Sequence, residues 1–129
     1  MKNHVILIDD NDVDNMMNQH LLQRLDQDLE ISIIDDSRLA FTLLEREFSQ
    51  VNSDKKTIIF LDENMPNLNG LEIMEALEDM EVLEESNVQV YFLTGDTSMR
   101  LVEKAAIMEN VVSVIHKPLN EASLAEIVL

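Results

Sequence analysis

Five short runs of valine, isoleucine, leucine and aromatic residues recur along the chain, and longer stretches with a different pattern separate them. The runs cover residues 5–8, 31–34, 57–61, 88–93 and 111–115. Their apolar residues are nearly continuous rather than alternating, which indicates strands buried on both faces, as in a parallel sheet. Parallel neighbours need a crossover connection, and an α-helix usually provides it. The runs therefore predict a five-stranded parallel sheet covered by helices.

The stretches between the runs have the spacing of amphipathic helices. The residues expected to face the sheet are Val13, Met17, Leu21 and Leu25 in the first stretch, Leu39, Leu43, Leu44 and Phe48 in the second, Leu71, Met74 and Leu77 in the third, Leu101, Val102, Ala105 and Met108 in the fourth, and Leu124, Ile127 and Val128 in the last. Asn120 is placed to cap the last helix. Five strand-and-helix steps predict a three-layer, doubly wound α/β fold with right-handed crossovers.

The length of 129 residues corresponds to one domain, spanning residues 1–129. Hydrophobic residues make up 46% of the chain, which is enough for a packed core. Only two glycines and two prolines occur, and no flexible linker interrupts the pattern. We expect a single domain with no output domain after the final helix.

The chain carries a formal net charge of −17. This charge repels nucleic acid backbones and anionic membrane surfaces, so neither is expected as a partner. Carboxylates and no basic residues lie between Lys56 and Arg100, and we interpret them as a solvated helix face rather than an acidic docking surface. The chain has no cysteine, and no apolar run is long enough for a signal peptide or a membrane span, so we expect a cytoplasmic protein.

Polar residues follow four of the predicted strands at the point where each strand ends. They are Asp9 and Asp10 after the first strand, Asp62 after the third, Thr94 after the fourth, and His116, Lys117 and Pro118 after the fifth. In an open parallel sheet, the ligand site lies beyond the carboxyl ends of the strands, where the strand order reverses. We therefore expect three carboxylates, a hydroxyl and an ammonium group to meet in one crevice.

These groups suit phosphoryl transfer with a divalent cation. Three neighbouring carboxylates raise one another's pKa values unless a cation keeps them ionised, and Mg²⁺ prefers oxygen ligands of this kind. A lysine and a hydroxyl can stabilise the negative charge on a phosphoryl group, and a carboxylate can be the nucleophile that forms an aspartyl phosphate. The residue set thus predicts a Mg²⁺-dependent phosphoryl-transfer site.

Four sequence motifs, taken in their order along the chain, resemble the motifs of the receiver domain of two-component response regulators. They are residues 6–10 (ILIDD), 60–70 (FLDENMPNLNG), 93–95 (LTG) and 116–119 (HKPL). Each motif lies at the end of a predicted strand, and the resemblance covers essentially the whole chain. It implies a flavodoxin-like fold with strand order 2-1-3-4-5, and a stand-alone receiver of the chemotaxis type.

The resemblance implies a role for each residue at the acidic end of the site. Asp62 would accept the phosphoryl group, and Asp10, Asp62 and the backbone carbonyl of Asn64 would bind Mg²⁺. Asp9 would act mainly through metal-bound water. Such a protein catalyses its own phosphorylation and dephosphorylation, and it is not an enzyme that turns over a separate substrate.

The resemblance also implies roles for residues around the phosphoryl group. After transfer, Thr94 would hydrogen-bond one phosphoryl oxygen and Lys117 would pair with another. Pro118 matches the family's proline after the lysine, which often follows a cis peptide bond. Asn64 and Asp96 occupy positions that tune self-dephosphorylation in this family.

One position departs from the family pattern. Receivers often carry Tyr or Phe three residues before the lysine, and this ring turns inward when the threonine moves; here the residue is Val114. A valine has no comparable ring to relocate, so an aromatic gate is not expected. Phosphorylation would draw Thr94 and the loop after it toward the new charge, which would bias the conformation of residues 98–118.

The implied partner is a histidine kinase or a histidine phosphotransfer domain, which would donate the phosphoryl group. The output would pass through contacts with a further protein or along a phosphorelay. The apolar residues of the first helix span an arc of about 240°, wider than is needed to cover a sheet. We hypothesise that Met16 or Leu22 contacts the partner, with packing under neighbouring loops as the alternative.

Two other functions remain open. A phosphorylation-independent binding module would keep the fold without the reaction, although the intact reactive residues argue against it. An aspartyl-nucleophile phosphohydrolase would use residues 10–12 (DND), with Asp12 as the acid/base, but this hypothesis leaves the motif at residues 62–70 unexplained.

Overall fold

The computed structural model describes residues 3–48, 56–79, 87–96 and 98–127. Its strands are β1 (His4–Ile8), β2 (Glu30–Ile34), β3 (Thr57–Asp62), β4 (Val88–Thr94) and β5 (Val111–His116). Its helices are α1 (Asp12–Leu25), α2 (Ser37–Phe48), α3 (Gly70–Asp79), α4 (Met99–Ala106) and α5 (Glu121–Ala125). Each predicted strand is confirmed and is one residue longer than expected.

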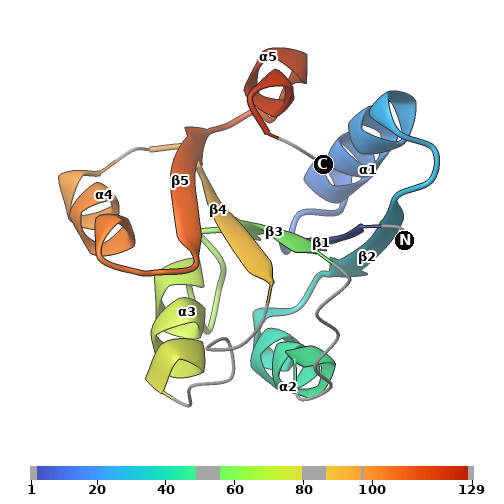
Figure 1. The fold of residues 1–129 in the computed structure, drawn as a ribbon. Helices are drawn as coiled ribbons and strands as arrows, with labels where there is room; N and C mark the ends of the chain where they lie inside the picture. The colour runs from blue at the N-terminus through green and yellow to red at the C-terminus, as the bar shows by residue number, and fades with distance from the viewer. Residues whose placement is uncertain (1–2, 49–55, 80–86, 97, 128–129) are drawn as a thin grey trace.

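The five strands form one parallel sheet in the order β2-β1-β3-β4-β5 (Figure 1). This is the doubly wound order that the resemblance implied. The order reverses at β1, because the chain moves from β1 outward to β2 and then returns to β3 on the other side. The carboxyl ends of β1 and β3 are neighbours at this reversal, which is where an open parallel sheet places its ligand site.

Helices cover both faces of the sheet and produce the predicted three layers. Helices α1 and α5 lie on one face, and α2, α3 and α4 lie on the other (Figure 1). Two apolar clusters fill the space between the layers. One cluster contains Ile6, Ile59 and Phe92, and the other contains Leu7, Phe60 and Tyr91. Successive strand residues thus point into opposite clusters, as strand geometry requires.

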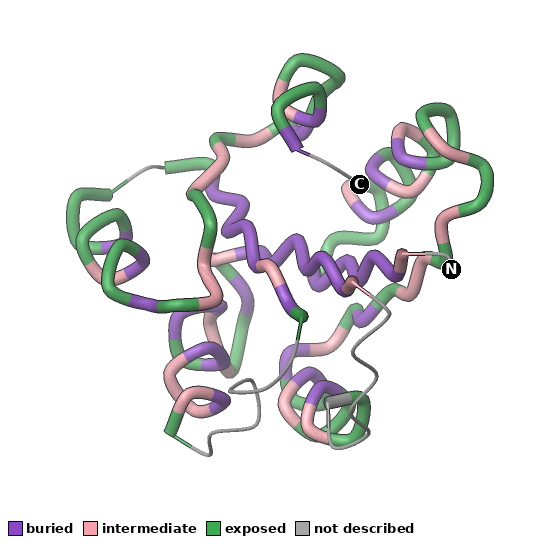
Figure 2. Tube along the Cα trace, viewed as in Figure 1, coloured by how far each residue is buried: buried purple, intermediate pink, exposed green. Residues whose placement is uncertain are grey.

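The central strands explain the nearly continuous apolar runs in the sequence. Every residue of β1 and β3 is buried, whereas β2 and β5 at the two edges of the sheet are partly exposed (Figure 2). Continuous apolar runs are therefore needed in the central strands, whereas the edge strands can also carry polar residues at their exposed positions. No helix among the described residues is long and apolar enough to span a membrane.

The predicted buried face of α1 is wrong. The side chains that α1 buries are those of Asn15, Asn18 and Leu22. The residues expected on this face, Val13, Met17 and Leu25, are exposed, and Leu21 is half-buried. The amide nitrogen of Asn15 donates a hydrogen bond of 2.7 Å to the backbone oxygen of Asp9, whereas its buried Oδ1 has no partner among the described residues.

The exposure of individual side chains on α1 also tests the hypothesis that Met16 or Leu22 contacts a partner. Leu22 is fully buried, with a relative exposure of 0%, so its assignment to a partner contact is wrong. Met16 is 63% exposed, which agrees with the expectation that part of the apolar surface of α1 remains uncovered. The position of Leu22 in the core follows from the rotation of the helix that the two buried asparagines define.

The other helices agree more closely with the predicted faces. In α2, Leu44 is buried as expected, but Leu39 and Leu43 are exposed, because Ser37 and Ala40 face the core instead. The predicted core residues of α3 are all buried, whereas Val102 of α4 is exposed beside its buried neighbour Leu101. Leu124 and Ile127 are buried, and the predicted cap at Asn120 is confirmed by its bond from the Ser123 N–H. The side chains of Phe48 and Val128 lie outside the described residues, as do residues 80–86, which contain three of the carboxylates between Lys56 and Arg100.

Candidate functional site

Three carboxylates converge at the point where the strand order reverses. Asp9 and Asp10 follow β1, and Asp62 ends β3, which pairs directly with β1. One oxygen from each of Asp9, Asp10 and Asp62 lies within 4.8 Å of the others. Asp9 and Asp62 are buried, and Asp10 is exposed at the opening of the cluster. The predicted acidic crevice is therefore present.

Lys117 reaches this cluster from the end of β5. Its Nζ lies 3.1 Å from Oδ2 of Asp9, 3.2 Å from Oδ1 of Asp62 and 3.2 Å from Oδ2 of Asp14. An ammonium group has three N–H donors, so these carboxylates can use all of them. The Lys117 ammonium thus contacts carboxylates from the segment after β1, the first turn of α1 and the end of β3.

The surroundings of Asp62 and Lys117 shift the pKa values of both side chains. Burial, and after it the charge of Asp9, raise the pKa of Asp62 to about 6, against the opposing effects of Lys117 and the N–H of Asn64. Burial also disfavours the ammonium of Lys117, but the hydrogen bonds and charges of Asp9 and Asp62 outweigh it and raise the pKa of this lysine. Lys117 therefore stays charged, and the site keeps more negative than positive charge.

The segment after Asp62 is fixed by hydrogen bonds and close packing. The N–H of Asn64 donates to Oδ1 of Asp62 at 3.2 Å. Asn69 and Glu72 accept hydrogen bonds from each other's N–H groups at 2.8 and 3.1 Å, which is a capping box at the start of α3. A Cβ atom on Gly70 would lie 2.7 Å from the backbone oxygen of Asp62. The glycine of the D-x-x-M-P-x-x-x-G motif is therefore required by the close approach of α3 to the end of β3.

The predicted residues at the ends of β4 and β5 lie beside the cluster. Thr94 is buried, and its hydroxyl donates to the backbone oxygen of Asp96 at 2.9 Å. The N–H of Lys117 donates to the backbone oxygen of Thr94 at 2.8 Å, which places the two residues on adjacent strand ends. The Lys117–Pro118 peptide bond is cis, as the resemblance implied. Val114 is half-buried and packs against the core on the side of α4.

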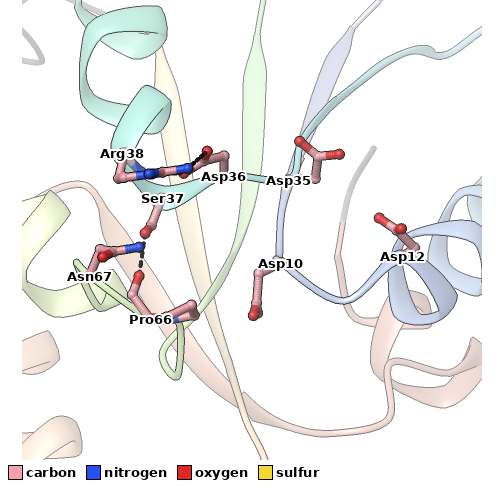
Figure 3. Close-up of a pocket in the computed structure, with 8 residues that line it drawn as sticks. All are labelled: Asp10, Asp12, Asp35, Asp36, Ser37, Arg38, Pro66 and Asn67. Carbon is pink, nitrogen blue, oxygen red and sulfur yellow. Dashed lines mark hydrogen bonds and ion pairs between the residues drawn. The ribbon is translucent and has the colours of Figure 1, made fainter.

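A hollow of about 390 Å³ opens beside Asp10 (Figure 3). Its walls come from the start of α1, the segment between β2 and α2, the start of α2 and the β3–α3 loop, and they include Asp12 and Asp35. Arg38 is paired with Asp36 at 2.8 Å on one side of this hollow. The hollow gives the exposed carboxylate of Asp10 an open approach from solvent.

Two residues that contact the site were not predicted from the sequence. Asp14 contributes a carboxylate to Lys117, and Asn15 binds the backbone of Asp9. Asp14 lies in the first turn of α1, and this helix begins two residues after the strand-end carboxylates Asp9 and Asp10. A carboxylate in the first turn so soon after a strand end was therefore a usable signal in the sequence.

The sheet order and the acidic cluster at its carboxyl edge place the chain in the class of doubly wound α/β domains with a ligand site at the strand-order reversal. A family model described as the response regulator receiver domain matches residues 5–129. The chain belongs to this family and is a receiver domain of two-component signalling.

Solved structures agree with this assignment. A two-component response regulator from Cytophaga hutchinsonii is 26% identical, with a TM-score of 0.80 over 98% of this chain and 95% of that chain. The chemotaxis protein CheY4 from Vibrio cholerae is 21% identical, with a TM-score of 0.75 over 98% and 95% of the two chains. A chain from the co-crystal structure of the Saccharomyces cerevisiae histidine phosphotransfer protein Ypd1 and the receiver domain of Ssk1 is 19% identical, with a TM-score of 0.74 over 97% and 85%. No curated protein sequence matches.

The family match favours the receiver over the phosphohydrolase alternative. In the hydrolase alternative Asp12 is the acid/base, and the structure places it at the exposed first residue of α1. The three-carboxylate cluster contains Asp9, Asp10 and Asp62 and does not include it.

Proposed function

We propose that this receiver accepts a phosphoryl group on Asp62 from a phosphohistidine and signals through protein contacts. The observation that carries the proposal is the contact between the ammonium of Lys117 and a buried carboxylate, Asp62, that lies within an acidic cluster. This arrangement supplies a nucleophile and a fixed positive charge in the same place. The protein is then a phosphoacceptor that promotes its own modification and is not an enzyme with a separate substrate.

The chemistry follows from the positions of these groups. An oxygen of Asp62 forms a bond to phosphorus while the bond from phosphorus to the donor's nitrogen breaks, and the electron pair leaves with the donor imidazole. Negative charge spreads over the phosphoryl oxygens, and the Lys117 ammonium can donate a hydrogen bond to one of them. The Thr94 hydroxyl can reorient from the Asp96 backbone toward another. This reorientation would draw the loop after β4 and pass the signal to residues 98–118.

The donor set of the cluster fits Mg²⁺. Three carboxylates lie together, and burial and the charge of Asp9 raise the pKa of Asp62, so a bound cation would stabilise its ionised form. Asp10, Asp62 and the backbone carbonyl of Asn64 would hold the ion, with Asp9 acting through its water. When bound, Mg²⁺ supplies positive charge that offsets the negative charge of the phosphoryl group.

The test of this proposal is the intact mass of the protein after incubation with acetyl phosphate. We expect the wild type to gain one phosphoryl group when Mg²⁺ is present, because the cation offsets the repulsion between the acidic cluster and the anionic donor. We expect no gain when EDTA removes the cation. A time course with rapid acid quenching keeps self-hydrolysis from hiding the product. Absence of any gain at all quench times would favour the binding module that needs no phosphorylation.

Helix α1 offers a surface for the phosphohistidine partner. Val13, Met16 and Met17 are all exposed on this helix, and α1 begins two residues after Asp10. An apolar patch beside an acidic crevice suits a helical bundle that brings its histidine to Asp62. The complex of a receiver with the phosphotransfer protein Ypd1 among the similar structures supports this kind of partner.

We expect Met16→Asp to lower the rate of phosphotransfer from a phosphohistidine domain by about tenfold, because a charge would replace apolar contact area at the centre of the surface. The reaction with acetyl phosphate needs no protein contact and should stay at the wild-type rate. Met99→Asp is the matched control, since Met99 is an exposed methionine at the start of α4. Equal transfer rates for the wild type and both variants would remove α1 as the docking surface.

A further inference from the structure

Lys117 contacts two carboxylates of the acidic cluster and a third carboxylate that lies outside the cluster. Asp9 and Asp62 belong to the cluster, but Asp14 comes from the first turn of α1 and lies outside it. All three oxygens are 3.1–3.2 Å from Nζ, so Asp14 is as close to the ammonium as the proposed phosphoacceptor is. The three N–H donors of Lys117 are therefore shared among three anions.

The position of Asp14 is fixed by the start of the helix. Its backbone N–H donates to the side chain of Asn11, the N-cap of α1, at 3.0 Å. Its side chain is 38% exposed and lines a hollow of about 60 Å³ together with Lys117 and Pro118. The Asp14 carboxylate thus holds the ammonium from the solvent side of the site, while Asp9 and Asp62 hold it from the buried side.

A carboxylate in the first turn also has an ordinary role, because it interacts favourably with the positive end of the helix dipole. Asp12 has the same role, since it too lies in the first turn of α1. Asp12 differs in that its carboxylate is not among the partners of Lys117 in the described part of the chain. The pair Asp12 and Asp14 therefore separates the effect of a charge at the helix start from the effect of the contact with Lys117.

We infer that Asp14 is a positioning residue that competes with the phosphoryl group for Lys117 and so slows phosphorylation of Asp62. This inference rests on the proposed function. With acetyl phosphate as donor, an oxygen of Asp62 bonds to phosphorus while the bond to the acetate oxygen breaks, and acetate leaves with the electron pair. The charge on the phosphoryl oxygens then needs the ammonium, which Asp14 draws toward solvent and partly neutralises.

The test is the rate of phosphorylation by acetyl phosphate with Mg²⁺, followed by intact mass, for Asp14→Asn and Asp12→Asn. We expect Asp14→Asn to react about threefold faster than the wild type or more, and Asp12→Asn to stay within about 1.5-fold of it, because solvent weakens the effect of a charge that makes no direct contact. A defect in folding would slow the reaction, so an increase in rate separates competition from a merely structural role.

A second pair of variants tests whether the effect passes through Lys117. In a Lys117→Met background, Asp14→Asn should change the rate by less than about 1.5-fold, because the ammonium for which Asp14 and the phosphoryl group compete is no longer present. The inference is overturned if Asp14→Asn reacts no faster than the wild type, if Asp12→Asn accelerates equally, or if the acceleration persists without Lys117. A wild type that gains no phosphoryl group would instead overturn the proposed function.

Discussion

Asp62→Asn is expected to abolish the mass gain with acetyl phosphate and Mg²⁺. An amide oxygen is a poor nucleophile, and the substitution removes the only group that forms the bond to phosphorus in the proposed reaction. The side chain keeps almost the same size and can still accept a hydrogen bond from Lys117, so the fold should not change. Intact mass at several quench times measures the result directly.

The control for this substitution is Asp35→Asn. Asp35 is an exposed carboxylate just after β2, outside the three-carboxylate cluster, so its loss should leave the mass gain unchanged. Urea unfolding adds a check on folding. Above pH 6, Asp62→Asn should be at least as stable as the metal-free wild type, because it removes a buried carboxylate whose pKa is raised. A mass gain that survives in Asp62→Asn would show that another residue accepts the phosphoryl group.

Lys117→Met is expected to lower the rate of phosphorylation by about 100-fold, which is typical for the loss of one preorganised charge donor at a developing negative charge. Methionine fills a similar volume but offers neither a positive charge nor an N–H. The substitution also leaves Asp9 and Asp62 buried without their cation, so it increases the repulsion that the anionic donor meets. Initial rates at saturating Mg²⁺ measure the effect on transfer rather than on cation binding.

Lys104→Met provides the comparison. Lys104 lies on α4 and pairs with Glu75 at 3.5 Å, with both side chains more than 40% exposed. A surface pair of this kind contributes little, so the rate should match that of the wild type. If Lys117→Met and Lys104→Met react at the same rate, the ammonium at the cluster has no part in the transfer.

The strands could be predicted from the sequence because the buried sheet leaves a simple pattern. The end of each apolar run marks the end of a strand to within one residue, and Asp9, Asp62 and Lys117 stand at those ends. The convergence of these residues follows from topology alone, since all strands of a parallel sheet end at one edge. The family motifs then gave each residue a specific expected role.

The rotation of α1 could not be predicted in this way. Apolar spacing favoured the face that contains Val13 and Met17, yet the helix buries Asn15 and Asn18. A hydrophobicity pattern treats asparagine as a surface residue, but the Asn15 amide is buried because it satisfies the backbone oxygen of Asp9. The same rotation brings Asp14 to Lys117. Such contacts depend on pairings between distant residues that no local pattern contains.

Gly70 has a consequence for how sequences of this kind are compared. Its Cα faces the backbone oxygen of Asp62 so closely that no side chain fits between α3 and the end of β3. A related chain could retain every carboxylate and the lysine, and so appear fully equipped in a search for reactive groups. With a larger residue at this position, its acceptor would be displaced from the lysine and the other carboxylates. The chemically inert glycine is therefore as informative a marker of a working acceptor as the aspartates themselves.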